Sequence, residues 1–144
     1  MSKKTNISRG IRNNNPLNII HGASWKGMAT EQTDRRFVQF KTMEYGIRAA
    51  FKTLQTYHTR WRCLTLRQYI TRWCPPAEKG NNTEKYIQFV AKSSNVKPDE
   101  WLPAPRKAGV MWCEIVDAMI KVECGQAISK DTIIRAYSLA FNQK

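Results

Sequence analysis

Acidic residues, histidines and long apolar runs are scarce in this sequence. Of 144 residues, 11 are Asp or Glu and 2 are His, and the four cysteines show no CxxC spacing. This argues against a zinc site, and we expect neither a metal nor another cofactor. No apolar run reaches the roughly 18 residues of a membrane span, and the basic start lacks a signal-peptide core. We therefore expect reduced thiols in a protein that stays in the cytoplasm or is exported without a cleaved signal.

Basic residues, by contrast, are abundant and unevenly distributed. The net charge is +13, and residues 1–72 carry 14 Lys and Arg against 3 Asp and Glu. Such a field attracts a polyanion. Nucleic acid, an acidic membrane surface and the anionic bacterial wall all fit, and charge alone does not choose among them.

The length and the 42% hydrophobic content suit one globular domain over residues 1–144. Residues 1–11 are expected to form a flexible basic arm. Short apolar or alternating segments between residues 17 and 40 predict a small antiparallel sheet near the N-terminus. The remainder follows helical spacing, so the predicted class is α+β and mostly helical. The expected helices start after Thr42, at Thr65, at Thr83, at Ala108 and at Lys130.

The helix expected over residues 108–122 is apolar on nearly every side. Its charged residues, Glu114, Asp117 and Lys121, form one narrow stripe, which predicts a central, buried helix. Gly125 stands where a helix C-cap is expected. Glu123 falls opposite the stripe, on the buried side, unless the last turn frays and its carboxylate turns to water.

Several motifs resemble a family of small phage and prophage murein hydrolases, either virion-associated or of the endolysin type. The most specific is the run from Arg9 to Ile19, which contains three asparagines before Pro16. Supporting matches are Trp25-Lys26-Gly27, Phe37 to Phe40, Glu44 to Ala49, Pro75-Pro76 with Glu78 and Thr83, Tyr86-Ile87, and Glu123-x-Gly125. The family loop between Glu78 and Thr83 is usually shorter than the one in this chain.

The resemblance implies a lysozyme-like domain that cleaves peptidoglycan as a muramidase or lytic transglycosylase. Such enzymes place their acid in Glu-Ser-Gly at the end of a buried helix, before a small β region. Here the comparable Glu123-Cys124-Gly125 comes near the C-terminus, so we expect the same parts in permuted order. The implied setting is bacteriophage lysis, from the host cytoplasm or from the virion, by a monomer that acts on the cell wall and is antimicrobial.

Glycosidic cleavage needs a carboxylic acid that is still protonated near neutral pH. Burial and the negative end of a helix dipole both disfavour a charged carboxylate, and Glu123 would experience both. Glu78 and Glu44 are the other catalytic candidates. The alternative for Glu78 is a solvated loop side chain, and for Glu44 a favourable interaction with the helix N-terminus.

Five further residues are candidates for substrate binding. The asparagines Asn14, Asn15 and Asn18 either hydrogen-bond sugar N-acetyl groups or build the turn before the predicted sheet. Trp25 either stacks on a sugar ring or belongs to the core, and Tyr86 either reaches the site or packs in its helix.

Two other functions remain open at the level of sequence. The basic N-terminal half, with interspersed Trp25, Phe37 and Phe40, is compatible with a module that follows a nucleic-acid backbone. However, its Lys and Arg residues are spread over several elements, so nucleic acid is the less favoured partner. A non-catalytic structural virion protein would share the fold, because fold does not fix function.

Overall fold

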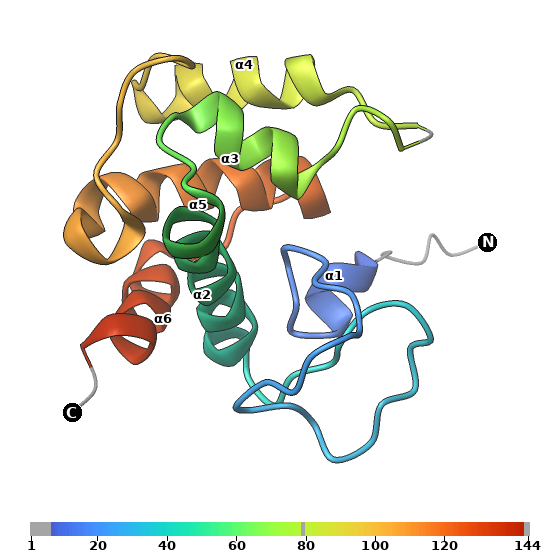
Figure 1. Cartoon of the computed structure of the whole chain (residues 1–144). Helices are drawn as coiled ribbons and strands as arrows, with labels where there is room; N and C mark the ends of the chain where they lie inside the picture. Colours follow the sequence, from blue (N-terminus) through green and yellow to red (C-terminus); the bar gives the residue numbers. More distant parts are fainter. Residues whose placement is uncertain (1–6, 79, 143–144) are drawn as a thin grey trace.

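The computed structural model describes residues 7–78 and 80–142, and its regular elements are helices (Figure 1). In chain order they are α1 (Arg9–Arg12), α2 (Met43–Trp61), α3 (Leu66–Trp73), α4 (Thr83–Ser94), the 3₁₀ turn η1 (Pro105–Lys107), α5 (Gly109–Cys124) and α6 (Lys130–Phe141). Helices α3 and α4 form one side of the molecule, α2 and α6 pack together on another, and α5 runs between them. A long irregular segment connects α1 to α2.

Local capping explains where the helices begin. The Thr42 hydroxyl accepts a hydrogen bond from the Tyr45 N–H, and Thr65 forms a capping box with Gln68. The predicted starts of α2 and α3 and the predicted bounds of α6 are confirmed. In α4 the cap is Asn82 rather than Thr83, and the helix extends to Ser94. Thr83 instead donates to the Cys74 carbonyl oxygen at 2.6 Å.

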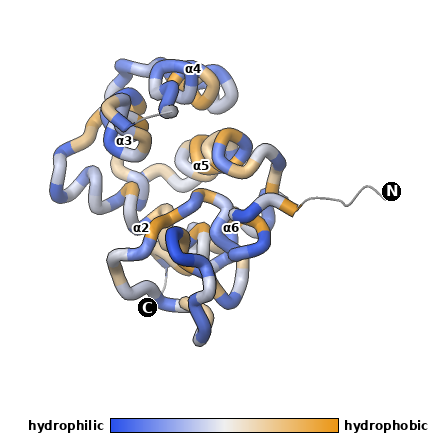
Figure 2. Tube along the Cα trace, turned by 90° about the vertical axis from the view of Figure 1, so that its right-hand side faces the viewer, coloured by the Kyte–Doolittle hydropathy of each residue, from blue (hydrophilic) through white to orange (hydrophobic). Residues whose placement is uncertain are grey.

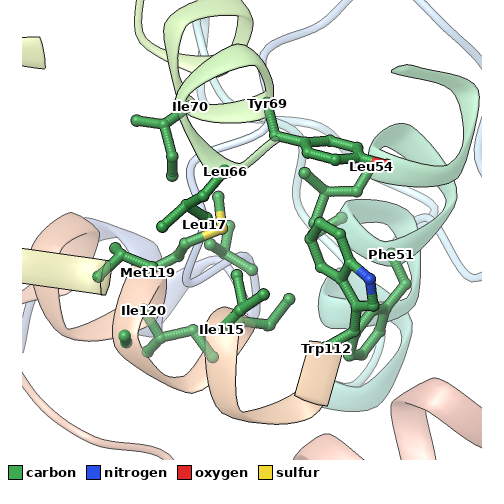
Figure 3. Packing of buried hydrophobic residues seen from close by; sticks show 14 of the residues in the cluster. Leu17, Phe51, Leu54, Leu66, Tyr69, Ile70, Trp112, Ile115, Met119 and Ile120 are labelled. Atoms are coloured by element: carbon green, nitrogen blue, oxygen red, sulfur yellow. The ribbon is translucent and has the colours of Figure 1, made fainter. Parts of the chain in front are cut away.

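Helix α5 lies at the centre of the main core, as predicted. Trp112, Ile115 and Met119 are fully buried against α2 and α3, as Figure 3 shows. Much of α5 takes the hydrophobic colours of Figure 2, whereas the surface loops are mainly hydrophilic. Asp117, from the expected polar stripe, is also buried and pairs with Lys121 at 3.4 Å.

The antiparallel sheet predicted within residues 17–40 is wrong. No segment of residues 7–78 and 80–142 forms a β-strand, and this stretch contains only two isolated antiparallel bridges, Ile20–Phe37 and Met28–Phe40. The α+β class is therefore replaced by a mostly helical one. Because the permuted lysozyme-like arrangement included that sheet, it is not supported either.

Side chains take the hydrogen bonds that a longer ladder would need. Asn15 accepts from the Ile19 N–H and donates to the Ile19 and Val38 carbonyl oxygens, all within 2.8–2.9 Å. The Asp34 carboxylate accepts from the N–H groups of Arg36 and Phe37. Once these backbone groups are bonded to side chains, pairing between segments stops after a single bridge.

The irregular segment is fixed to the helices by close backbone contacts. Asn14 adopts a left-handed conformation with φ 53°, and its side chain donates to the Phe40 carbonyl oxygen. Its own carbonyl oxygen lies against Gly46 of α2, where a Cβ atom would clash with it. Of the predicted basic arm, residues 1–6 lie outside the described residues, while Arg9, Gly10 and Ile11 belong to α1.

Candidate active site

A cleft of about 580 Å³ separates the irregular segment from the α3–α4 connection. One part of the lining comes from residues 17–23, 25, 36 and 37, and another from residues 72–75, 78 and 81. Thr53 and Tyr57 of α2 and Glu123 of α5 complete it. The residues of the lining that carry polar or aromatic groups are Asn18, His21, Trp25, Arg36, Phe37, Thr53, Tyr57, Arg72, Trp73, Glu78, Asn81 and Glu123.

The Glu123 carboxylate is held by three side-chain donors from three different parts of the chain. The Trp73 indole N–H and the Tyr86 hydroxyl both donate to Oε2, at 3.1 and 2.9 Å. The Asn18 amide donates to Oε1 at 3.1 Å and also reaches the Glu123 carbonyl oxygen at 3.3 Å. The carboxylate therefore has one orientation, and Oε1 carries fewer hydrogen bonds than Oε2.

Local features of the backbone place two of the donors and the carboxylate itself. Trp73 is the last residue of α3, directly before the Cys74-Pro75-Pro76 stop. Asn18 is left-handed, with φ 58°. Gly125 caps α5 with φ 77°, so Glu123 is the second-last residue of the helix, which ends at Cys124. These three chain reversals converge on one carboxylate.

The Tyr86 hydroxyl group keeps its proton and so remains a hydrogen-bond donor to Glu123. Its side chain is buried in α4, and burial together with the adjacent Glu123 carboxylate raises the pKa of Tyr86 well above its usual value. The phenol therefore stays protonated at physiological pH. It supports Glu123 from the protein interior and is not among the residues that line the cleft.

The cleft contains a second carboxylate, that of Glu78. Its side chain is exposed and lies in the turn after Pro75, where the Glu78 N–H donates to the Pro75 carbonyl oxygen. The Cys74 thiol is close enough to both acids to feel their charge. Burial raises the pKa of this thiol, and the charges of Glu123 and Glu78 raise it further. Glu78 and Glu123 thus belong to the same site.

The remaining predicted site residues divide into two groups. Asn18 and Trp25 line the cleft, and Trp25 also packs beside the small core of Val38, Phe40 and Ala49. Asn14 and Asn15 use their amides on the backbone of the irregular segment, and Asn15 is completely buried.

Glu44 is separate from the cleft. It occupies the first turn of α2 and pairs with Arg135 of α6 at 3.1 Å, beside a different surface hollow. Glu44 thus has the alternative position described in the sequence analysis, a favourable interaction with the N-terminus of its helix, and it also forms an ion pair.

Trp73, Tyr57 and Arg72 were not identified from the sequence. The proline pair predicted that α3 ends at Trp73, but not that the indole turns towards α5. Tyr57 follows the core spacing of α2 and contacts Trp73 edge to face, with ring centroids 6.3 Å apart. No local signal distinguishes such residues from ordinary packing.

Two kinds of site are not found in the described part of the chain. Residues 7–78 and 80–142 contain no cluster of three or more His, Cys, Asp or Glu side chains able to hold a metal ion. None of the helices described there has the length and apolar character needed to cross a bilayer.

The chain is similar to a known phage protein. The chain is 38% identical over 127 residues to Protein P5 of Pseudoalteromonas phage PM2, and the match covers 82% of this chain and 72% of the phage protein. The chain belongs to the family of this phage protein. Membership in the Protein P5 family supports the phage part of the sequence-based resemblance, but the name describes no activity. No family model matches the chain.

Proposed function

We propose that this member of the Protein P5 family cleaves the glycan strands of peptidoglycan, with Glu123 as the general acid. The observation that carries the proposal is the fixed carboxylate of Glu123 in a cleft with aromatic walls. Acid catalysis needs a carboxyl group held within hydrogen-bonding distance of the leaving oxygen. Only a group with a fixed orientation meets this requirement reliably.

The hydrogen bonds of Glu123 identify the oxygen that would carry the proton. A carboxylate offers about four lone-pair positions, and Oε2 already uses two of them for Trp73 and Tyr86. Among residues 7–78 and 80–142, Oε1 accepts from the Asn18 side chain alone. It therefore keeps one position for a proton that can be given to a glycosidic oxygen.

The lining of the cleft suits a sugar polymer in an anionic wall. Trp25, Tyr57 and Trp73 contribute aromatic rings to the lining. Asn18 and Asn81 contribute amide groups, whose nitrogens also donate to Glu123 and to the Pro75 carbonyl oxygen. The net charge of +13 favours approach to the wall, whose carboxylates and phosphates are negative. Glu78 is the other carboxylate in the lining, and we assign it to water activation or to stabilisation of the cationic transition state.

The test compares Glu123→Gln with a matched Glu44→Gln variant. We expect Glu123→Gln to lose about 10²–10⁴-fold of murein cleavage, because the amide keeps the shape but has no acidic proton to give. Glu44→Gln should cleave like the wild type, because Glu44 lies outside the cleft. Release of soluble glycan fragments from purified murein is the measurement, and melting temperatures verify that each variant is folded.

A third variant, Glu78→Gln, sharpens the assignment. Chromatography of its products separates reducing sugars from anhydro sugars and so reports whether water or a sugar hydroxyl completes the reaction. If the Glu123→Gln variant cleaves murein as fast as the wild type, Glu123 is not the general acid. Absence of cleavage by the wild-type protein would favour a non-catalytic virion component.

A further inference from the structure

A second hollow, of about 620 Å³, adjoins the cleft on the side of α3. We name it the arginine groove and define it by Trp61, Arg62, Arg67, Arg72 and Pro75. Trp61 is half exposed, at 48%, and ends α2. The groove therefore joins an accessible aromatic ring with three guanidinium groups.

The charges of the three arginines are balanced to different degrees. Arg67 pairs with Glu84 at 2.6 Å and with Asp99 at 2.9 Å, so its charge is locally neutralised. Within the described part of the chain, Arg62 and Arg72 make no ion pair with a carboxylate. Their positive charge is left for a ligand.

Aromatic contacts hold part of this charge in place. The Arg72 guanidinium carbon lies 4.1 Å from the centre of the Trp61 ring and 5.8 Å from that of Tyr57. Arg60 does not line the groove, but its guanidinium carbon lies 5.4 Å from the centre of the Trp61 ring and adds to the positive charge beside it. Guanidinium groups stacked on aromatic rings are positioned in advance, which lowers the entropy cost of binding a carboxylate.

The arginine groove is continuous with the cleft. Arg72 and Pro75 belong to the linings of both hollows. A polymer bound in the cleft can therefore place its side branches in the groove while its main chain passes Glu123.

We infer that the arginine groove binds the carboxylates of the peptide stems attached to the glycan strand. This inference rests on the proposed function, and it adds a preference for peptide-bearing strands over bare glycan. Planar guanidinium groups match carboxylates in two-point hydrogen bonds. One observation favours this ligand over a nucleic acid: Arg72 already covers the Trp61 ring, where a base would stack.

The experiment changes Arg60→Gln and Arg62→Asn together. Both residues are exposed and lie outside the cleft lining. Arg62 has a left-handed backbone with φ 57°, which asparagine tolerates. The matched control is Lys92→Gln with Lys107→Gln, two exposed residues outside the arginine groove whose removal lowers the net charge equally.

Binding is measured in the Glu123→Gln background with labelled soluble glycan strands. One set keeps its peptide stems after endopeptidase treatment, and the other has lost them to an amidase. The arginine variant should bind stem-bearing strands about tenfold more weakly, the loss expected for a charge-assisted contact worth about 1.4 kcal/mol. Its affinity for bare strands and the affinity of the lysine control for both sets should be unchanged.

Three outcomes would overturn the inference. They are an equal loss for bare and stem-bearing strands, no loss for either, and a loss confined to single-stranded oligonucleotides, which would assign the groove to nucleic acid. Cleavage by the chain with wild-type Glu123 is measured separately. Stem-dependent binding without cleavage would thus refute the proposed catalysis and not the assignment of the groove.

Discussion

The two sides of the cleft are stabilised by different means. On the helical side, backbone hydrogen bonds are formed within α3 and α4, and side chains act mainly at the caps. On the irregular side, between α1 and α2, single polar side chains satisfy several backbone groups each, as Asn15 and Asp34 do. Most polar residues of the helical side should therefore be replaceable, whereas those of the irregular side stabilise its backbone.

The largest difference between the two sides should appear with Asn15→Ala. The Ile19 N–H and the Val38 carbonyl oxygen would lose their side-chain partner in a buried position. Each unsatisfied group costs about 1–3 kcal/mol, so the free energy of unfolding should fall by about 2–6 kcal/mol. Urea denaturation of the variant and the wild type measures this change.

The matched control on the helical side is Thr65→Ala, which removes the N-cap hydrogen bond of α3. The expected cost is about 0.5–2 kcal/mol, because water can replace a cap at the surface. Equal losses for the two variants would contradict the proposed difference between the sides.

A smaller and pH-dependent effect is expected for Asp34→Asn. The Arg9 guanidinium, followed by the Phe37 N–H, holds the pKa of Asp34 well below its usual range. A lowered pKa in the folded state stabilises the fold above the unfolded pKa of about 3.9, and this contribution is lost as the pH falls further. The wild type should therefore melt higher than the variant at pH 6, and the gap should narrow below about pH 4.

Melting curves of both proteins from pH 2 to pH 7 provide the measurement. If the difference in melting temperature between the two proteins stays constant over this range, the negative charge of Asp34 does not stabilise the fold. The hydrogen bonds to Arg9 at 2.7 Å would then contribute no more than neutral ones.

The smallest effect is expected for Glu84→Gln on the helical side. Glu84 forms an exposed pair with Arg67, which keeps Asp99 as a second partner. Exposed ion pairs contribute about 0–1 kcal/mol, so the free energy of unfolding should change by less than about 1 kcal/mol. Denaturation in urea at low salt provides the measurement, and a loss above about 2 kcal/mol would mean that the helical side also depends on single polar contacts.

Most helices of this protein follow from the sequence alone, whereas α1 was not predicted, because residues 1–11 were expected to form a flexible arm. Helix starts such as Thr42 and Thr65, and the central position of α5, follow from residues within one or two turns of each other. The sequence also identified Glu123 as a candidate acid, because a carboxylate in the last turn of an apolar helix is a local feature. Local hydrogen bonds and local periodicity are sufficient for these predictions.

The other features depend on contacts between remote parts of the chain. The segment from Arg36 to Phe40 partly alternates as a strand does, yet distant side chains take its backbone partners and no sheet forms. The donors to Glu123 are 105, 50 and 37 residues away in sequence, and Glu44 and Glu78 are distinguished by where α2 and the α3–α4 connection come to lie. A hydrogen bond between remote residues depends on the packing of every element between them, and no short stretch of sequence specifies that packing.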